Sequence, residues 1–518
     1  MVILYKFVFM RLLIFTAIVL LNARCQFTKD RVTSPSFTEA VSVHYDTAMR
    51  PFYHGVASGD PLTDKVIIWT RVTPEDSVPS IEVSWEISTN EAFEPVVKHG
   101  VFSTSPQRDY TVKIDVDGLA PDTRYYYRFQ ALEETSSLGR TKTLPKENVD
   151  SLRFAVVSCS NWQHGYFNAY DRIAEKDLDA VLHLGDYIYE YGVNNAKNVD
   201  RRHLPEHEVI TLSDYRIRYS QYHLDSGLRK MRQQHPLIAI WDDHEVANNT
   251  YVEGAQNHQP EEGDFLERKA AARQAYYEWI PIREGEKHYR AFTFGNLAEL
   301  IMLDERQEGK TKPAEGISDP VYRGKERSML GRQQLNWLES ELTTASATWR
   351  VIGNQVMFTD FDRSEVNSKN PRNMDSWDGY PVEKEKIAGI IRENNLRNII
   401  FLTGDTHASW AFEVVVDGAG SHSGTYQPLA VEFGTPSVSS ANANESSPDD
   451  TVIIREQTYP KMNPHLKYVN QRDHGYLLLT LSPEKARADW YYVNILRPDE
   501  KETLARSIRV DVNSNSLK

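Results

Sequence analysis

The chain has 518 residues, 40% of them hydrophobic, and a formal net charge of −14. This length allows a large core and more than one domain. The acidic balance argues against a polyanion-binding surface, so no specific nucleic-acid partner is expected.

The N-terminus has the pattern of an export signal. Lys6 and Arg11 precede an apolar run from Leu12 to Leu21, which is too short to span a bilayer unaided. We therefore predict a signal peptide over residues 1–25, cleaved after Cys25, and a periplasmic or secreted enzyme. Its removal takes away three basic and no acidic residues, so the net charge moves from −14 to −17.

Two alternatives at the N-terminus stay open at this point. The apolar run could be a permanent anchor, and Cys25 could carry a lipid, although Arg24 stands where a lipoprotein signal has a small residue. No later segment is long and apolar enough for a transmembrane helix, so no stable membrane anchor is expected after signal removal. The second cysteine, Cys159, is then left without a disulfide partner.

The sequence pattern of the next segment, residues 41–147, is typical of an all-β domain. Short β-branched and aromatic runs such as KVIIWTRV, IEVSWEIS and TRYYYRFQAL alternate with turn signals, which predicts a β-sandwich domain. The stretch DGLAPDTRYYYRF (Asp117 to Phe129) resembles the L-x-P-x-T-x-Y-x-Y pattern of fibronectin type III-like sandwiches. Pro145 and the charges around it interrupt the pattern, and we expect the domain boundary there.

From residue 151 to residue 518 the pattern changes to α/β, with apolar strands between amphipathic stretches. Loops that leave the carboxyl ends of strands line the ligand crevice in an open α/β sheet. The segment 437–450, SVSSANANESSPDD, is expected to be a polar surface loop. Helices are predicted over 168–177, 265–279 and 331–342, and strands over 153–158, 180–184, 237–241, 297–303, 349–358 and 398–404.

Polar clusters follow four of these strands. Each cluster alone has an ordinary structural explanation, such as a packed cysteine or a Gly-Asp turn. Together they predict a polynuclear metal site, because anionic side chains gathered in a crevice need cations to offset their repulsion and desolvation. The clusters are SCSN (Cys159, Asn161), GDYIYEYG (Asp186, Tyr189), WDDHEVANN (Asp242, Asp243, His244, Glu245, Asn248) and GDTHASW (Asp405, His407).

The order of these four motifs resembles the alkaline phosphatase D (PhoD-like) family of calcineurin-like metallophosphoesterases. The segments at 52–74, 303–306 and 474–493 resemble other parts of that family, so the resemblance covers roughly residues 45 to 500. It implies an αββα metallophosphoesterase sandwich behind the β-sandwich domain, and hydrolysis of phosphate esters. One departure is visible, since LDERQEGK lacks the aromatic residue that often follows the arginine and glutamine.

The resemblance also implies ligands. Cys159 would be a thiolate ligand of iron(III), Asp186 would bridge iron and a second cation, and Tyr189 would add a phenolate. The iron set would be completed by His407, whereas Asp243 and Asp405 would give a second position of hard oxygen ligands. Hard oxygen ligands shift the preference of that position away from zinc toward calcium or magnesium, so calcium is expected there, with magnesium, zinc or manganese as alternatives. Two further oxygen ligands are expected at Asn248 and Asn354.

The implied chemistry is hydrolysis by a metal-activated water or hydroxide. His244 is the candidate to protonate the leaving alkoxide, and Asn161 and Arg306 are candidates for phosphate contact. The predicted function is that of an exported metal-dependent phosphoesterase acting on small phosphate esters. The alternatives are a phosphodiesterase or phospholipase D-like enzyme acting on lipid or teichoic-acid-like diesters, and a secreted glycan-binding protein with an inactive α/β scaffold.

Overall fold

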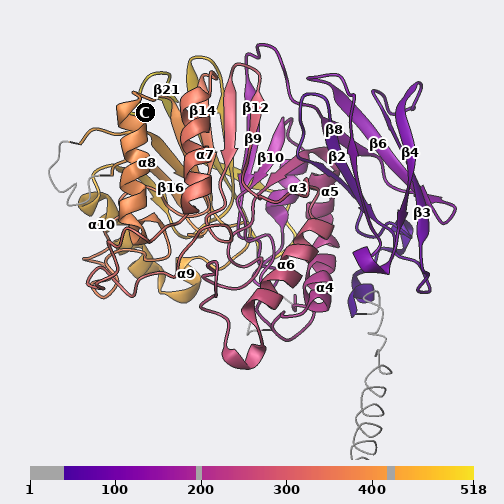
Figure 1. Ribbon diagram of the computed structural model, residues 1–518, viewed down its shortest axis with the longest axis horizontal. Coiled ribbons are helices and arrows are strands. Elements are labelled where there is room, and N and C mark those ends of the chain that lie inside the picture. The colour runs from indigo at the N-terminus through magenta and orange to yellow at the C-terminus, as the bar shows by residue number, and fades with distance from the viewer. Residues whose placement is uncertain (1–39, 194–200, 417–425) are drawn as a thin grey trace, which may run out of the picture.

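The computed structural model of the protein describes residues 40–193, 201–416 and 426–518 (Figure 1). The predicted signal peptide lies outside these residues. Among the helices of the described ranges, none combines the length and the apolar character needed to cross a membrane.

A nine-stranded sheet runs through the molecule in the order β21-β20-β19-β9-β10-β11-β1-β2-β5. Its central strands β9, β10, β11 and β1 are parallel to one another. The short runs FAVV and AVLH that form its middle are buried on both faces, as parallel strands require. The bounds are β1 (Val56–Gly59), β2 (Val66–Arg71), β5 (Thr111–Val116), β9 (Leu152–Val157), β10 (Ala180–His183), β11 (Pro236–Ala239), β19 (His474–Leu481), β20 (Lys485–Val493) and β21 (Glu502–Asp511).

A seven-stranded sheet faces the first one, in the order β12-β13-β14-β15-β17-β16-β18. Apolar side chains from both sheets, including Phe154 and Val156 of one and Leu300 and Ile400 of the other, form a single buried layer between them. The bounds are β12 (Arg290–Phe294), β13 (Ala298–Met302), β14 (Trp349–Gly353), β15 (Ile399–Thr403), β16 (Ser409–Glu413), β17 (Val431–Gly434) and β18 (Leu466–Asn470).

Helices cover the outer faces of the two sheets (Figure 1). The apolar sides of α3 (Asn168–Ala174), α4 (Leu212–His223), α5 (Ser226–Gln234) and α6 (Phe265–Trp279) pack on the nine-stranded sheet. The seven-stranded sheet is covered by α7 (Gly331–Thr344) and α8 (Pro381–Glu393). The chain therefore has the predicted αββα layers. The predicted helices correspond to α3, α6 and α7, whereas α4, α5 and α8 were not predicted. Two more helices that the sequence did not indicate, α9 (Ala443–Ser446) and α10 (Asp449–Met462), follow β17.

The N-terminal region is a β-sandwich that shares a sheet with the α/β core. One of its sheets holds β3 (Ile81–Ser88), β4 (Val96–Thr104), β6 (Arg124–Ala131), β7 (Glu134–Thr135) and β8 (Gly139–Lys142). The other is made of β1, β2 and β5, which continue the nine-stranded sheet beyond β11. Ser58 and Gly59 of β1 pair with Pro236 and Leu237 of β11, and the buried Asp60 forms an ion pair with Arg290 at 2.8 Å.

This shared sheet leads to a prediction about the fragment 151–518. Expressed alone, it would leave β11 as an unpaired edge strand and would remove the carboxylate partner of Arg290, so we expect an insoluble or molten product. Solubility and a cooperative thermal transition measure this, with residues 26–518 as the control. A soluble, active fragment would show instead that the predicted division near residue 150 separates two autonomous units.

Strand and helix predictions agree closely with the structure where the apolar pattern is strong. The predicted helix 265–279 coincides with α6, and the predicted strand 349–358 ends early, at Gly353. The prediction of a polar surface loop over 437–450 is wrong. Ser439 and Ser440 are buried and donate backbone hydrogen bonds to the carbonyl of Cys159, so this small-residue segment fits beneath the end of β9.

Candidate metal centre and active site

The predicted site residues lie in loops that leave the carboxyl ends of neighbouring strands. Cys159 follows β9, Asp186 follows β10, and Asp405 and His407 follow β15. All four adopt left-handed backbone conformations, with φ values of 61°, 53°, 56° and 52°. Such conformations cost non-glycine residues roughly 1–3 kcal/mol and persist only where the surroundings enforce them, often at functional sites. We infer that the surrounding structure enforces these backbone conformations, and that they place the four side chains in the positions that the site requires.

The first group of candidate metal ligands gathers around Asp186. The Sγ of Cys159, a carboxylate oxygen of Asp186 and a ring nitrogen of His407 lie within 4.8 Å of one another. The Tyr189 hydroxyl donates to Asp186 Oδ2 at 2.8 Å and lies 3.1 Å from His407 Nε2. His407 Nδ1 donates to the Ala441 carbonyl at 2.9 Å, which leaves Nε2 to face the group, as in many metal-binding histidines.

The second group consists of carboxylates from the other loops. Oxygens of Asp242, Asp243 and Asp405 lie within 4.8 Å of one another, and a further set joins Asp243 to Asp186 and His244. Asp242 Oδ2 and Asp243 Oδ1 are buried and have no hydrogen-bond partner among the described residues. Carboxylate oxygens buried in this way are costly unless a cation binds them. The side chains present thus fit at least two adjacent metal ions.

Burial sets the electrostatics of both groups. It raises the pKa of the Cys159 thiol, of the Tyr189 phenol and of the Asp186 carboxyl well above their usual ranges. It also raises the pKa of Asp405 to about 6. Without cations the Cys159, Tyr189 and Asp186 side chains favour their neutral forms, whereas binding of a multivalent cation favours the anionic forms and releases protons.

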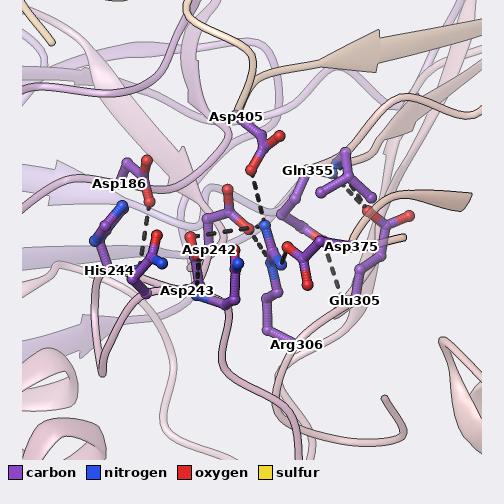
Figure 2. A network of polar contacts seen from close by, with 12 residues as sticks. Asp186, Asp242, Asp243, His244, Glu305, Arg306, Gln355, Asp375 and Asp405 are labelled. Atoms are coloured by element: carbon purple, nitrogen blue, oxygen red, sulfur yellow. Dashed lines mark hydrogen bonds and ion pairs between the residues drawn. The ribbon is translucent and has the colours of Figure 1, made fainter. Parts of the chain in front are cut away.

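Arg306 lies at the centre of the carboxylates in Figure 2. It is fully buried, its Nε donates to Asp242, and its two terminal nitrogens donate to Asp375 and, at 2.9 Å, to Asp405. Lys310 Nζ adds a second cation 2.5 Å from Asp375. The guanidinium thus binds three carboxylates and offsets their negative charge. Its contact with phosphate stays a prediction.

His244 is held by a buried carboxylate. Its Nδ1 donates to Glu190 Oε2 at 2.6 Å, and its ring lies 4.2 Å from the ring of Tyr189, centroid to centroid. Burial disfavours the charged imidazole, but the carboxylates of Glu190, Asp186 and Asp243 outweigh it and raise the pKa of His244 well above its usual value. Nε2 makes no hydrogen bond to any described residue, so the imidazolium has a proton available for a ligand.

The remaining polar residues of the motifs take supporting positions. Glu245 accepts the backbone N–H groups of Asp186 and Asp242, at 3.1 and 2.8 Å, and so joins two ligand loops. Asn161 Oδ1 accepts the Gln163 N–H at 3.0 Å, and the Asn248 amide donates to Gln256 at 2.9 Å. Phosphate contact by Asn161 and metal ligation by Asn248 stay predictions.

Asn354 does not lie as a ligand would. Its Oδ1 accepts a hydrogen bond from Trp377 Nε1 at 2.9 Å, and its amide donates to the Val356 carbonyl. The side chain is fully buried, with both ends of its amide occupied within the protein. We conclude that Asn354 stabilises the loop after β14 through these hydrogen bonds.

Sequence reasoning missed three residues of this network. Glu190 stands in the quoted motif GDYIYEYG, one position after Tyr189, and its acidic character next to a buried run was a usable signal. Asp375 lies in a long segment without strands, where no local pattern marks it, and Lys310 ends the quoted stretch LDERQEGK, in which it was given no role. They are recognised only because the fold brings them to Arg306.

Comparisons with known proteins agree with this geometry. The family described as "PhoD-like phosphatase" matches residues 154–490, and "PhoD-like phosphatase, N-terminal domain" matches residues 38–145. Alkaline phosphatase D of Bacillus subtilis (strain 168) is 39% identical over 471 residues, which covers 85% of this chain and 77% of that protein. A solved structure titled "Structure of PhoD" superposes with a TM-score of 0.83 at 35% identity, covering 91% of this chain and 92% of that one.

These matches confirm the predicted resemblance and the fold, and they exclude the alternative of an inactive binding scaffold. Phosphate esters are the substrates of such an enzyme, and the grouped carboxylates, thiol and imidazoles are consistent with metal dependence. The chain belongs to the PhoD-like phosphatase family and is a metal-dependent phosphoric ester hydrolase.

Proposed function

We propose that the enzyme is exported and hydrolyses phosphate esters with iron(III) and calcium. The observation that carries this proposal is the meeting of a thiol, a phenol, an imidazole and carboxylates from four separate loops within one buried crevice. Cys159, Asp186, Tyr189 and His407 would hold iron, because thiolate and phenolate suit a trivalent ion. Asp243 and Asp405, with Asp186 as the bridge and Asn248 as a further ligand, would hold calcium.

The residues around these ligands have separate tasks. When bound, the cations supply positive charge that offsets the phosphate oxygens and lowers the pKa of the attacking water. His244 holds a proton on its imidazolium, which Glu190 orients, and donates it to the departing alkoxide. Asn161 would orient the phosphate, and Arg306 keeps the carboxylates charged and in place.

Removal of calcium tests the second position. The oxygen ligands should release calcium to a calcium-selective chelator, whereas the thiolate- and phenolate-bound iron should stay. We expect activity to disappear while the visible absorption persists, and added calcium to restore activity. The matched variant is Asp405→His, which loses one negative charge, offers an imidazole, and should recover better with zinc or manganese.

Recovery of the parent enzyme with zinc but not with calcium would contradict the assignment of the second position. Activity against each metal after chelation, measured side by side for the parent and the variant, gives this answer.

Export follows from the sequence pattern of residues 1–25 and is part of the proposal. A chain that begins at residue 26 should be a soluble cytosolic product with poor metal content. If that truncated chain needs detergent to stay in solution, the apolar run is not the segment that confers membrane affinity, and the signal interpretation fails.

A phosphodiesterase or phospholipase D-like enzyme is the second candidate function. A diester needs room for a second substituent, and a cavity of about 180 Å³ borders Asp405 and Thr406. Assays of the metal-analysed native enzyme with matched monoesters and diesters of one leaving group distinguish the two functions. A higher kcat/KM for the monoester would exclude the diester alternative.

A further inference from the structure

We propose that the cavity beside Asp405 is a substrate subsite that receives one aromatic ring of the phosphate ester. This inference rests on the proposed function, in which Asp405 holds a cation at the phosphate. The cavity has a volume of about 180 Å³ and is bordered by Asp405 and Thr406. A cavity of roughly 150 Å³ suffices for a benzene ring, so this one has room for a single substituted ring.

One wall of the cavity is aromatic. Phe361 packs edge-on against Trp410, with ring centroids 5.2 Å apart, and lies 5.0 Å from the ring of Tyr459. The Trp410 Nε1 donates to Thr406 Oγ1 at 2.8 Å, which ties this wall to the loop that carries the ligands Asp405 and His407. A ring that enters beside them gains apolar burial and edge-to-face contact.

The other wall is polar and incompletely bonded. Arg363 and Gln471 both line the cavity. Arg363 Nε and Gln471 Oε1 are buried atoms that have no hydrogen-bond partner among the described residues. No ion pair to Arg363 forms within the described ranges either. A buried donor and a buried acceptor are costly when unpaired, and both belong to side chains on this wall. They suit a ring with polar substituents at its edge.

The position of the cavity fixes what would fill it. A phosphate bound to the cation at Asp405 would lie next to the cavity, because Asp405 lines it, and its ester oxygen could point into this space. The substituent on that oxygen then enters between the aromatic and the polar walls. We therefore expect aryl esters to bind more tightly than methyl esters of the same phosphoryl group.

Binding of non-hydrolysable ligands to the full, metal-loaded enzyme tests this by calorimetry. Phenylphosphonate and methylphosphonate share the anionic group and differ in the ring, and inorganic phosphate reports the phosphate site alone. We expect the phenyl compound to bind about tenfold or more tightly than the methyl compound. The Gln471→Trp variant, which fills the cavity, should bring this ratio close to one.

The control variant is Gln333→Trp, which places the same side chain on the exposed surface of α7 and should keep the ratio of the parent. As a second variant, Arg363→Met should weaken 4-nitrophenylphosphonate by several-fold relative to phenylphosphonate, since it removes a donor to the nitro group.

Two results would overturn the inference while leaving the phosphate site intact. One is equal affinity of the parent for the phenyl and methyl compounds, with normal binding of phosphate. The other is a Gln471→Trp variant that binds phosphate and still discriminates as the parent does. If phosphate and both phosphonates fail to bind, the proposed phosphate site at Asp405 is wrong and the subsite falls with it.

Discussion

Replacement of Cys159 by alanine is expected to abolish iron binding and to lower kcat at least about 1000-fold, because a metal ligand and a negative charge disappear together. The fold should persist, since the side chain is small and buried and the backbone bonds of its loop do not depend on the sulfur. The measurements are metal content, visible absorption and kcat on a phosphate monoester. Cys159→Ser should lose iron almost as completely, because a hydroxyl is a poor replacement for a thiolate.

Ser160→Ala is the matched control. This substitution removes the buried hydroxyl of the residue next to Cys159. Because that hydroxyl bonds Tyr170 and none of the proposed ligands, the iron content should stay near that of the parent. A Cys159→Ala enzyme with full iron content and activity would show that this cysteine is merely packed.

Arg306→Met is expected to lower the free energy of unfolding of the metal-depleted protein by about 3–5 kcal/mol. The reason is electrostatic: the variant leaves Asp242, Asp375 and Asp405 buried without the guanidinium that binds all three. Part of the loss should return when calcium is added, because the cation binds only the folded carboxylate cluster. Denaturant unfolding with and without calcium measures both effects.

Arg350→Met provides the comparison. Its guanidinium is partly buried, whereas that of Arg306 is fully buried, and it donates to the backbone carbonyls of Leu342 and Ala345 and to no carboxylate, so the loss should be smaller and insensitive to calcium. Equal losses in the two variants would mean that Arg306 contributes packing and hydrogen bonds without special electrostatic weight.

The layers of the fold could be predicted because their signal is local. Strands such as 180–184 are continuous apolar runs, and the helix 265–279 has both an N-capping Asp264 and a clear pattern of apolar spacing. The division into a β-sandwich and an α/β region was also visible. That β1 pairs with β11 was not, since sequence patterns carry no information about which strands from distant segments lie side by side.

The residues that gather in the crevice could be predicted because they come in dense motifs directly after strands. The supporting network could not. Asp375 stands in the long segment between β14 and α8, and not directly after a strand. Its hydrogen bond with Arg306 joins positions 69 residues apart. The first part of the segment 437–450 was misread because serine and asparagine are usually exposed, whereas here Ser437, Ser439, Ser440 and Asn442 are buried. The Ser437 hydroxyl bonds the Ser440 carbonyl and Asn442 Oδ1.

Elemental analysis of the purified native enzyme, with its visible spectrum and activity recorded on the same sample, tests the central claim most directly. Iron and calcium should both be present in fixed proportion to the chain, and the enzyme should be coloured, because thiolate from Cys159 and phenolate from Tyr189 bound to iron(III) absorb visible light. A colourless preparation that contains no iron and is nevertheless fully active would contradict the account.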